Sequence, residues 1–249
     1  MVLFAALAFV TLREAGWGFV PALLVTLLGM VAGAIAIERF VLRALIGQSD
    51  LTLFMATLGL SFVIEGLAQL FMGASVHELN LGIDDIPIEV GPILVSQFDL
   101  LAAATAGALV ASLSLFFNFT RIGISLRAIA DDPLAAQSIG IRLPALWRIV
   151  WGVAGLVALV AGLLWGARQG VQFSLTLVVL KALPVLIIGG FTSIGGAIIG
   201  GLLIGASESL AEIYLGDLLG GSVSTWFAYV VALAFLLIRP AGLFGDRAI

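Results

Sequence analysis

Charged residues are scarce in this sequence, at 10% of its 249 residues, whereas hydrophobic residues make up 62%. A soluble domain carries about a quarter charged residues. The mean hydropathy is +1.23, and a water-soluble fold of this length could not bury so many apolar side chains. The composition therefore excludes a soluble domain and indicates an integral membrane protein.

Residues that could carry metal or catalytic chemistry are also missing. The chain has no cysteine and one histidine, His77, which excludes disulfides, thiolate metal sites and multi-histidine sites. It contains neither a GxxxxGK[ST] loop nor an HExxH motif, so it is not itself an ATPase or a zinc protease. We expect no metal, no cofactor and no catalytic residue. The five tryptophans lie near the ends of apolar runs, which is typical of an interfacial belt and not of a nucleic-acid surface.

Apolar runs separated by short charged clusters predict the fold. One helix needs about 20 residues to cross the hydrocarbon core. The runs lie at 2–12, 18–37, 51–72, 99–119, 148–166, 176–191, 194–213 and 222–238. They predict an all-α, polytopic helical bundle of about seven or eight spans that forms a single membrane domain over 1–249. The stretch 176–213 merges through a glycine-rich middle, so it could be two short spans, a broken helix or a re-entrant pair.

Basic residues predict the orientation. Eight arginines fall in connections that alternation of the spans places on one face of the membrane. They are Arg39, Arg43, Arg121, Arg127, Arg142, Arg148, Arg239 and Arg247. The loop 73–98 on the opposite face has four acidic residues and neither lysine nor arginine. The arginine face is therefore predicted to be cytoplasmic, together with the C-terminal tail.

The cytoplasmic connection 120–148 is long for a loop inside a bundle. Asp132 is a favoured N-cap residue, Pro133 suits the first helical position, and Gly140 suits a left-handed C-cap. The pattern predicts a short helix over 134–138 that carries Leu134 and Ile139 on a polar loop. Such a helix could dock into a groove of another protein, or the segment could be an ordinary basic connection.

Four segments in register resemble the permease family of branched-chain amino-acid ABC transporters. The longest reads Thr120-Arg121-x-Gly123-xxx-Arg127-Ala128-xx-Asp131-xxx-Ala135-Ala136-xxx-Gly140-Ile141. The others are Glu38-Arg39 with Arg43, Thr57-Leu58-Gly59-Leu60-Ser61, and Arg239-Pro240-x-Gly242-Leu243-Phe244-Gly245. The likeness covers essentially the whole chain, although family members usually have an additional helix before the first run. The chain thus resembles a member without its first helix, whether through a misassigned start, as a natural variant or as a fragment.

The resemblance implies a function and partners. It implies the membrane-spanning permease subunit of an ATP-driven importer, located in the bacterial inner membrane and carrying branched-chain amino acids. Its partners would be ATP-binding subunits, a second permease subunit and an extracytoplasmic solute-binding protein, and the second permease could be a copy of this chain or a paralogue. The residues implied to couple to the ATPase are Arg121, Gly123, Arg127, Asp131, Asp132, Ala135, Ala136, Gly140 and Ile141.

A translocation path can be sought among intramembrane charges and glycines. Ionisable residues in membrane spans are costly and often functional. A zwitterion could use a carboxylate for its ammonium and a lysine or helix N-terminus for its carboxylate. The candidates are Glu65, Lys181, Gly189, Gly190 and Glu208. Structural alternatives are a protonated Glu65, a lysine that reaches the interface, and glycines at 189–205 that simply allow close helix packing.

Other functions remain open at this point. Similar family members carry urea or short amides. The intramembrane glutamates would suit an ion-coupled carrier that works alone, but this function would not explain the family-like cytoplasmic loop. An intramembrane serine protease would need a base beside a buried serine, and the single histidine lies in the loop 73–98.

Overall fold

The fold is helical, as predicted, and the chain divides into two compact units. The computed structural model describes residues 1–45, 47–72, 75–82, 86–90, 93–190, 193–239 and 242–244. Five helices in this part of the chain are long and apolar enough to cross a membrane, and two apolar helices are shorter. Unit 1 is Met1–Leu175 and unit 2 is Thr176–Ile249. The single membrane domain over 1–249 stays a prediction.

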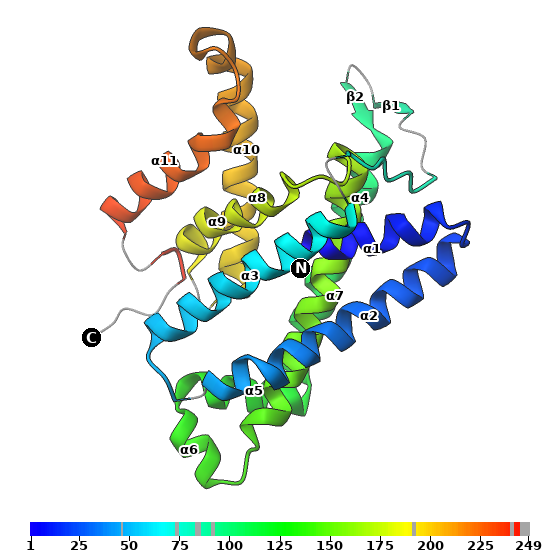
Figure 1. Cartoon of the computed structure of the whole chain (residues 1–249). Helices are drawn as coiled ribbons and strands as arrows, with labels where there is room; N and C mark the ends of the chain where they lie inside the picture. The colour runs from blue at the N-terminus through cyan, green and yellow to red at the C-terminus, as the bar shows by residue number, and fades with distance from the viewer. Residues whose placement is uncertain are drawn as a thin grey trace. The chain divides into compact units, whose positions relative to one another are not determined.

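Unit 1 holds seven α-helices, a 3-10 turn and a hairpin among its described residues (Figure 1). The elements are α1 (Val2–Glu14), α2 (Phe19–Phe40), η1 (Leu42–Leu45), α3 (Asp50–Met72), β1 (Pro87–Val90), β2 (Ile93–Ser96), α4 (Gln97–Phe119), α5 (Arg121–Asp131), α6 (Pro133–Ser138) and α7 (Leu143–Gln169), and the chain then enters α8 (Leu175–Leu180). The strands pair antiparallel. The hairpin and α5 were not predicted.

Helix α7 packs closely against α1 and α2 because it presents glycines to them. A Cβ on Gly155 would lie 3.0 Å from the carbonyl oxygen of Met30 in α2. One on Gly162 would lie 2.6 Å from the carbonyl oxygen of Val2 at the start of α1. Without a hydrophobic drive between helices in lipid, such small residues let backbones approach and gain van der Waals contact. The short α1 is thereby the most deeply buried helix of this unit.

The two ends of unit 1 differ in charge. Figure 1 places the C-terminal end of α2 together with α5 and α6 at one end, and the hairpin at the other. Six arginines belong to the first end, namely Arg39, Arg43, Arg121, Arg127, Arg142 and Arg148. The hairpin end carries Arg13 and Arg168 beside Glu14, Glu78 and Asp99. More arginines therefore lie at the α5–α6 end than at the hairpin end, as the loop charges predict. Of the predicted acidic loop residues, Asp84 and Asp85 lie outside the described residues.

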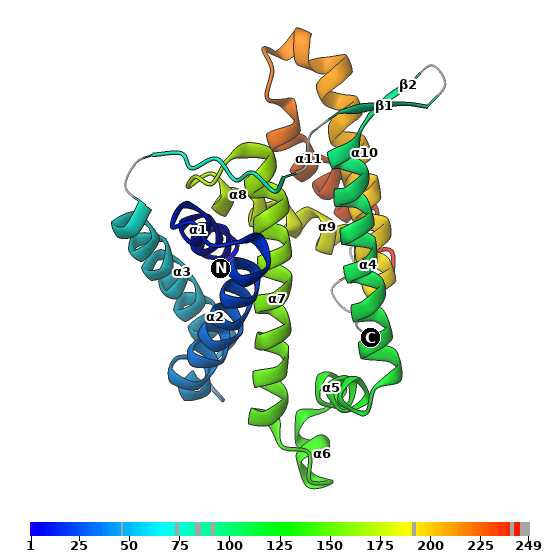
Figure 2. The ribbon, with the colours of Figure 1, turned by 90° about the vertical axis from the view of Figure 1, so that its right-hand side faces the viewer.

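Helix α4 stands apart from the core of unit 1. Figure 2 shows α7 between α4 on one side and α1, α2 and α3 on the other. No residue of α4 is buried. Its N-terminus is capped by the Ser96 hydroxyl, which accepts from the Asp99 amide at 3.1 Å, and the Asp99 carboxylate pairs with Arg168 of α7 at 2.5 Å.

In unit 2 the glycine-rich stretch forms three helices, and the second and third pack against each other. After α8 the chain turns at Lys181, continues as α9 (Ala182–Gly189), and turns again before α10 (Ile194–Leu219) and α11 (Val223–Ile238). Ile188, Ile204, Ala228 and Ala232 form the buried core that joins α9, α10 and α11. The interruption at Lys181 is consistent with a broken helix, and the packing of α9 against α10 is consistent with a re-entrant pair. The three alternatives for 176–213 therefore stay open.

Candidate functional site

The junction of α4 and α5 is held by residues of the family-like loop. The Thr120 hydroxyl donates to the Phe116 carbonyl at 2.6 Å and accepts from the Gly123 amide at 3.0 Å. A Cβ on Gly123 would overlap the backbone of Phe117. Arg127 donates to the Asn118 carbonyl at 3.3 Å. Three motif residues therefore fix the angle at which α5 leaves α4.

The short helix α6 has the predicted caps. The Asp132 carboxylate accepts from the amides of Leu134 and Ala135 at 2.9 and 3.0 Å, and Pro133 occupies the first turn. Gly140 follows the helix with φ of +89°, and the Ile141 amide donates back to the Ala136 carbonyl at 3.1 Å. This is a Schellman-type end, which needs a left-handed residue where glycine stands.

The loop residues divide into a buried and an exposed set. Gly123 and Ala136 are buried. Leu134 and Ile139, by contrast, are 79% and 76% exposed. The loop residues Arg121, Arg127, Asp131, Asp132, Ala135 and Gly140 are also exposed, and Ile141 is half-buried. The end of unit 1 thus presents two large aliphatic side chains on a short, well-capped helix.

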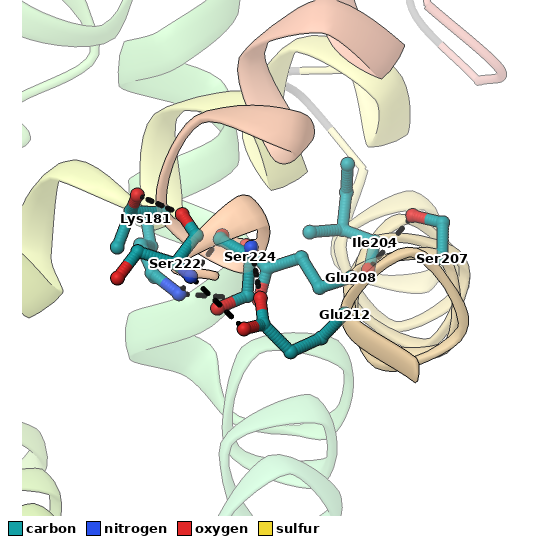
Figure 3. A network of polar contacts seen from close by, with 8 residues as sticks. Lys181, Ile204, Ser207, Glu208, Glu212, Ser222 and Ser224 are labelled. Atoms are coloured by element: carbon teal, nitrogen blue, oxygen red, sulfur yellow. Dashed lines mark hydrogen bonds and ion pairs between the residues drawn. The ribbon is translucent and has the colours of Figure 1, made fainter. Parts of the chain in front are cut away.

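Lys181 and Glu208, two of the predicted path residues, meet in unit 2 (Figure 3). The Lys181 ammonium lies at the break between α8 and α9 and donates to the Glu208 carboxylate and to the Ser224 carbonyl, both at 3.3 Å. Glu208 lies midway along α10, and its Oε1 is buried without a hydrogen-bond partner among the described residues. In a low-dielectric setting, pairing lowers the cost of both charges.

Glu212, one turn further along α10, caps the start of α11. Its carboxylate accepts from the Ser222 and Ser224 amides at 3.1 and 2.7 Å, as Figure 3 shows. Ser222 itself has φ of +58°, which is uncommon outside glycine. A carboxylate at a helix N-terminus is favourable because it meets free amides and the positive end of the dipole. The sequence analysis did not select Glu212, because the partner amides are ten and twelve residues away.

The glycines of 189–205 allow a backbone crossing between α9 and α10. A Cβ on Gly189 would overlap the Gly196 backbone, and one on Gly200 would lie 2.7 Å from the Val185 carbonyl oxygen. A Cβ on Gly205 would meet nothing within 4 Å. Gly196 and Gly200, which lie four residues apart on one side of α10, therefore make the contact, and Gly205 does not. Thr192, within this segment, lies outside the described residues.

The C-terminal motif closes the end of α9. The amides of Leu243 and Phe244 donate to the carbonyls of Ile188 and Gly189 at 2.8 and 3.3 Å. Gly242, with φ of +78°, brings its backbone against Gly190. The predicted path residues Gly189 and Gly190 thus lie where α9 ends and the tail returns. Pro240, Gly245 and Arg247 lie outside the described residues.

Two further glutamates lie in unit 1. Glu65, a predicted path residue, is half-buried on α3 and forms no ion pair with another described residue. Glu38, in the Glu38-Arg39 motif, is 2% exposed, and its Oε1 has no hydrogen-bond partner within the described chain. The structure therefore joins Lys181 with Glu208, while Glu65 belongs to the other unit.

Comparison with known proteins identifies the family. The family model for the branched-chain amino acid transport system permease component matches residues 1–239. The chain is similar to a probable branched-chain amino acid transport permease protein of Methanocaldococcus jannaschii, with 33% identity over 62% of this chain and 49% of that protein. It is 26% identical to a high-affinity branched-chain amino acid transport system permease protein of Escherichia coli, over 93% of this chain and 76% of that protein.

The chain is also similar to a protein whose name gives a different cargo. The autoinducer 2 import system permease protein of Shigella flexneri is 28% identical over 94% of this chain and 61% of that protein. The chain thus spans about half to three quarters of the length of these relatives. No solved structure is significantly similar to it.

Proposed function

Because the chain belongs to the family of branched-chain amino acid transport permease components, we propose that it forms part of the membrane path of an ATP-driven importer of branched-chain amino acids. The names of the relatives from Methanocaldococcus and Escherichia support this cargo. ATP hydrolysis would take place on separate subunits, since the sequence has no phosphate-binding loop. A second permease subunit, either another copy or a paralogue, and an extracytoplasmic binding protein complete the assembly.

The observation that carries the coupling role is the exposed aliphatic pair on α6. Leu134 and Ile139 are each more than three quarters exposed on a helix with caps at both ends. A short apolar ridge of this kind suits a groove on an ATP-binding subunit. The fixed α4–α5 junction makes the ridge part of a lever, because a push on α6 reaches α4 through Gly123 and Arg127. This end faces the cytoplasm, as does the C-terminal tail, in a bacterial inner membrane.

The path is supported by the Lys181–Glu208 pair. Both ends of a zwitterionic amino acid need a counter-charge inside the membrane, and this pair offers one of each sign at a helix break. Glu65 on α3, and Gly189 and Gly190 at the end of α9, are the other predicted path residues. Exchange of the Lys181–Glu208 contact for contacts to the cargo would offset the cost of separating the pair.

Isolation of the intact assembly tests the proposal. The chain is tagged at its C-terminus, released from its native membranes in mild detergent, and the co-purifying proteins are identified by mass spectrometry. Two ATP-binding subunits and a permease partner are expected. Recovery of the chain alone, from membranes in which those proteins are present, would contradict the proposal and favour an independent carrier or an inactive fragment.

A further inference from the structure

Unit 1 contains a polar pocket and an apolar groove that adjoin each other. The pocket, of about 580 Å³, is lined by Glu78, Asp99 and Arg168 among others. The groove, of about 540 Å³, runs between α4 and α7 and ends at Phe19 and Leu23 of α2. Leu81 and Phe98 line both cavities. The two cavities are therefore adjacent, with charged residues lining the pocket at the hairpin end and apolar side chains lining the groove.

The length of the groove matches one leaflet of a bilayer. Its lining on α4 runs along one face from Leu101 through Thr105 to Ser112. At a rise of about 1.5 Å per residue this is roughly 16 Å. Half of the hydrocarbon core is about 15 Å. The polar pocket lies at the N-terminal end of α4, where a headgroup of that leaflet would be.

The groove has an almost wholly apolar lining, with Leu101, Leu163 and Leu164 among its residues. An extended acyl chain in the groove would therefore contact hydrocarbon side chains on both α4 and α7. If the groove were empty, the side chains that line it would lose van der Waals contacts on that side.

The pocket contains side chains of both charges, which favours a zwitterionic lipid headgroup. Arg168 uses one N–H donor for Asp99, which leaves donors of its planar fork for a phosphate. Glu78, exposed in the same pocket, supplies a carboxylate for an ammonium group. A purely anionic headgroup would meet Glu78 and Asp99 as like charges.

We infer that this space is a binding site for a zwitterionic phospholipid of the phosphatidylethanolamine type from the leaflet on the hairpin side, with its phosphate on Arg168 and one acyl chain between α4 and α7. The lipid fills the space between α4, which has no buried residue, and α7. Since α4 continues through the fixed junction into α5, the bound lipid sets the position of the lever. This role is independent of which cargo the assembly carries.

Native mass spectrometry of the purified assembly tests the site. The protein, with its co-purifying subunits, is delipidated in mild detergent and titrated with palmitoyl-oleoyl phosphatidylethanolamine, with the matching phosphatidylglycerol, and with leucine. We expect one tightly bound phosphatidylethanolamine per chain and at least roughly tenfold weaker binding of phosphatidylglycerol, as for the loss of one charge-assisted bond.

Matched variants assign the binding to this space. Ala108→Trp fills the groove and should abolish tight binding, whereas Ala103→Trp, exposed on the opposite face of α4, should not. Arg168→Gln should weaken binding about tenfold. Arg13→Gln, a change to the other arginine of this end, should leave binding unchanged. Equal binding by the Ala108 and Ala103 variants, equal binding of the two lipids, or displacement of the lipid by leucine would each overturn the inference.

Discussion

At the scale of single residues, the sequence identified charged candidates but not their partners. Lys181 and Glu208 were selected because ions are costly in a membrane span, and the structure joins them across 27 positions of chain. The capping role of Glu212 was not predicted, since it depends on where the turn after α10 returns. Long-range contacts of this kind are set by the packing of helices, which hydropathy patterns do not specify.

The Lys181–Glu208 contact should behave as a coupled pair. Lys181→Met and Glu208→Gln should each lower thermal stability, because each leaves a largely buried partner unpaired, and the double variant should recover part of the loss. We expect a coupling free energy of about 0.5–3 kcal/mol, measured from unfolding of the purified variants in detergent. If the pair also serves the path, cargo uptake stays low in the double variant even though stability returns. Strictly additive stabilities would show that the two side chains do not interact.

Gly140 should be required for the shape of α6. Gly140→Val places a β-branched residue at φ of +89°, at a strain of roughly 1–3 kcal/mol. We expect transport to fall sharply while the amount of protein in the membrane is unchanged, as judged by uptake assays and immunoblots. Gly47→Val, at another exposed glycine with φ of +83°, is the control for strain outside the loop. Wild-type uptake by the Gly140 variant would remove the coupling assignment.

At the scale of elements, most helices could be predicted and most connections could not. The eight apolar runs correspond to α1, α2, α3, α4, α7, the α8–α9 pair, α10 and α11, and the Asp132 and Gly140 caps predicted α6. Helix α7 extends beyond its predicted run at both ends, to Leu143 and Gln169. At its C-terminal end it includes Arg168 and Gln169, because polar residues can continue a helix outside the hydrocarbon. Helix α5 was not predicted from the apolar runs because its sequence mixes arginines with aliphatic residues.

The crossing of α9 and α10 depends on Gly196 and Gly200. Gly196→Ala should destabilise unit 2 by about 1–3 kcal/mol, because the added methyl overlaps the Gly189 backbone. Gly205→Ala, on the same helix in open space, should be neutral or stabilising by up to about 1 kcal/mol. Thermal unfolding in detergent compares the two variants. A larger loss at Gly205 than at Gly196 would contradict the described crossing.

The exposed ridge of α6 should be the contact with the ATPase. Leu134→Glu puts a charge at a position that is 79% exposed, so it should leave folding intact and remove the ATP-binding subunits from the purified assembly. Gln137→Glu adds the same charge to the same short helix at another exposed position and should retain them. Quantitative mass spectrometry of the purified assemblies provides the comparison. Retention of the subunits by the Leu134 variant would place the docking surface elsewhere.

At the scale of the whole molecule, composition alone determined the class of protein and family motifs determined the kind of transporter. The motifs also have local structural roles, since Gly123 and Arg127 fix a junction and Leu243 and Phe244 close the end of α9. The identity of the cargo did not follow from these residues, because similar chains carry the names of branched-chain amino acid and autoinducer 2 systems.

The most direct measurement is uptake of labelled leucine by vesicles that contain this chain and its co-purified subunits, with the binding protein outside and ATP enclosed. The account predicts uptake that requires ATP, that stops when the phosphate-binding lysine of the ATPase subunits is replaced, and that is lost with the Leu134→Glu variant. Equal leucine uptake without ATP, or with the disabled ATPase, would contradict it and would show that the chain works as a carrier by itself.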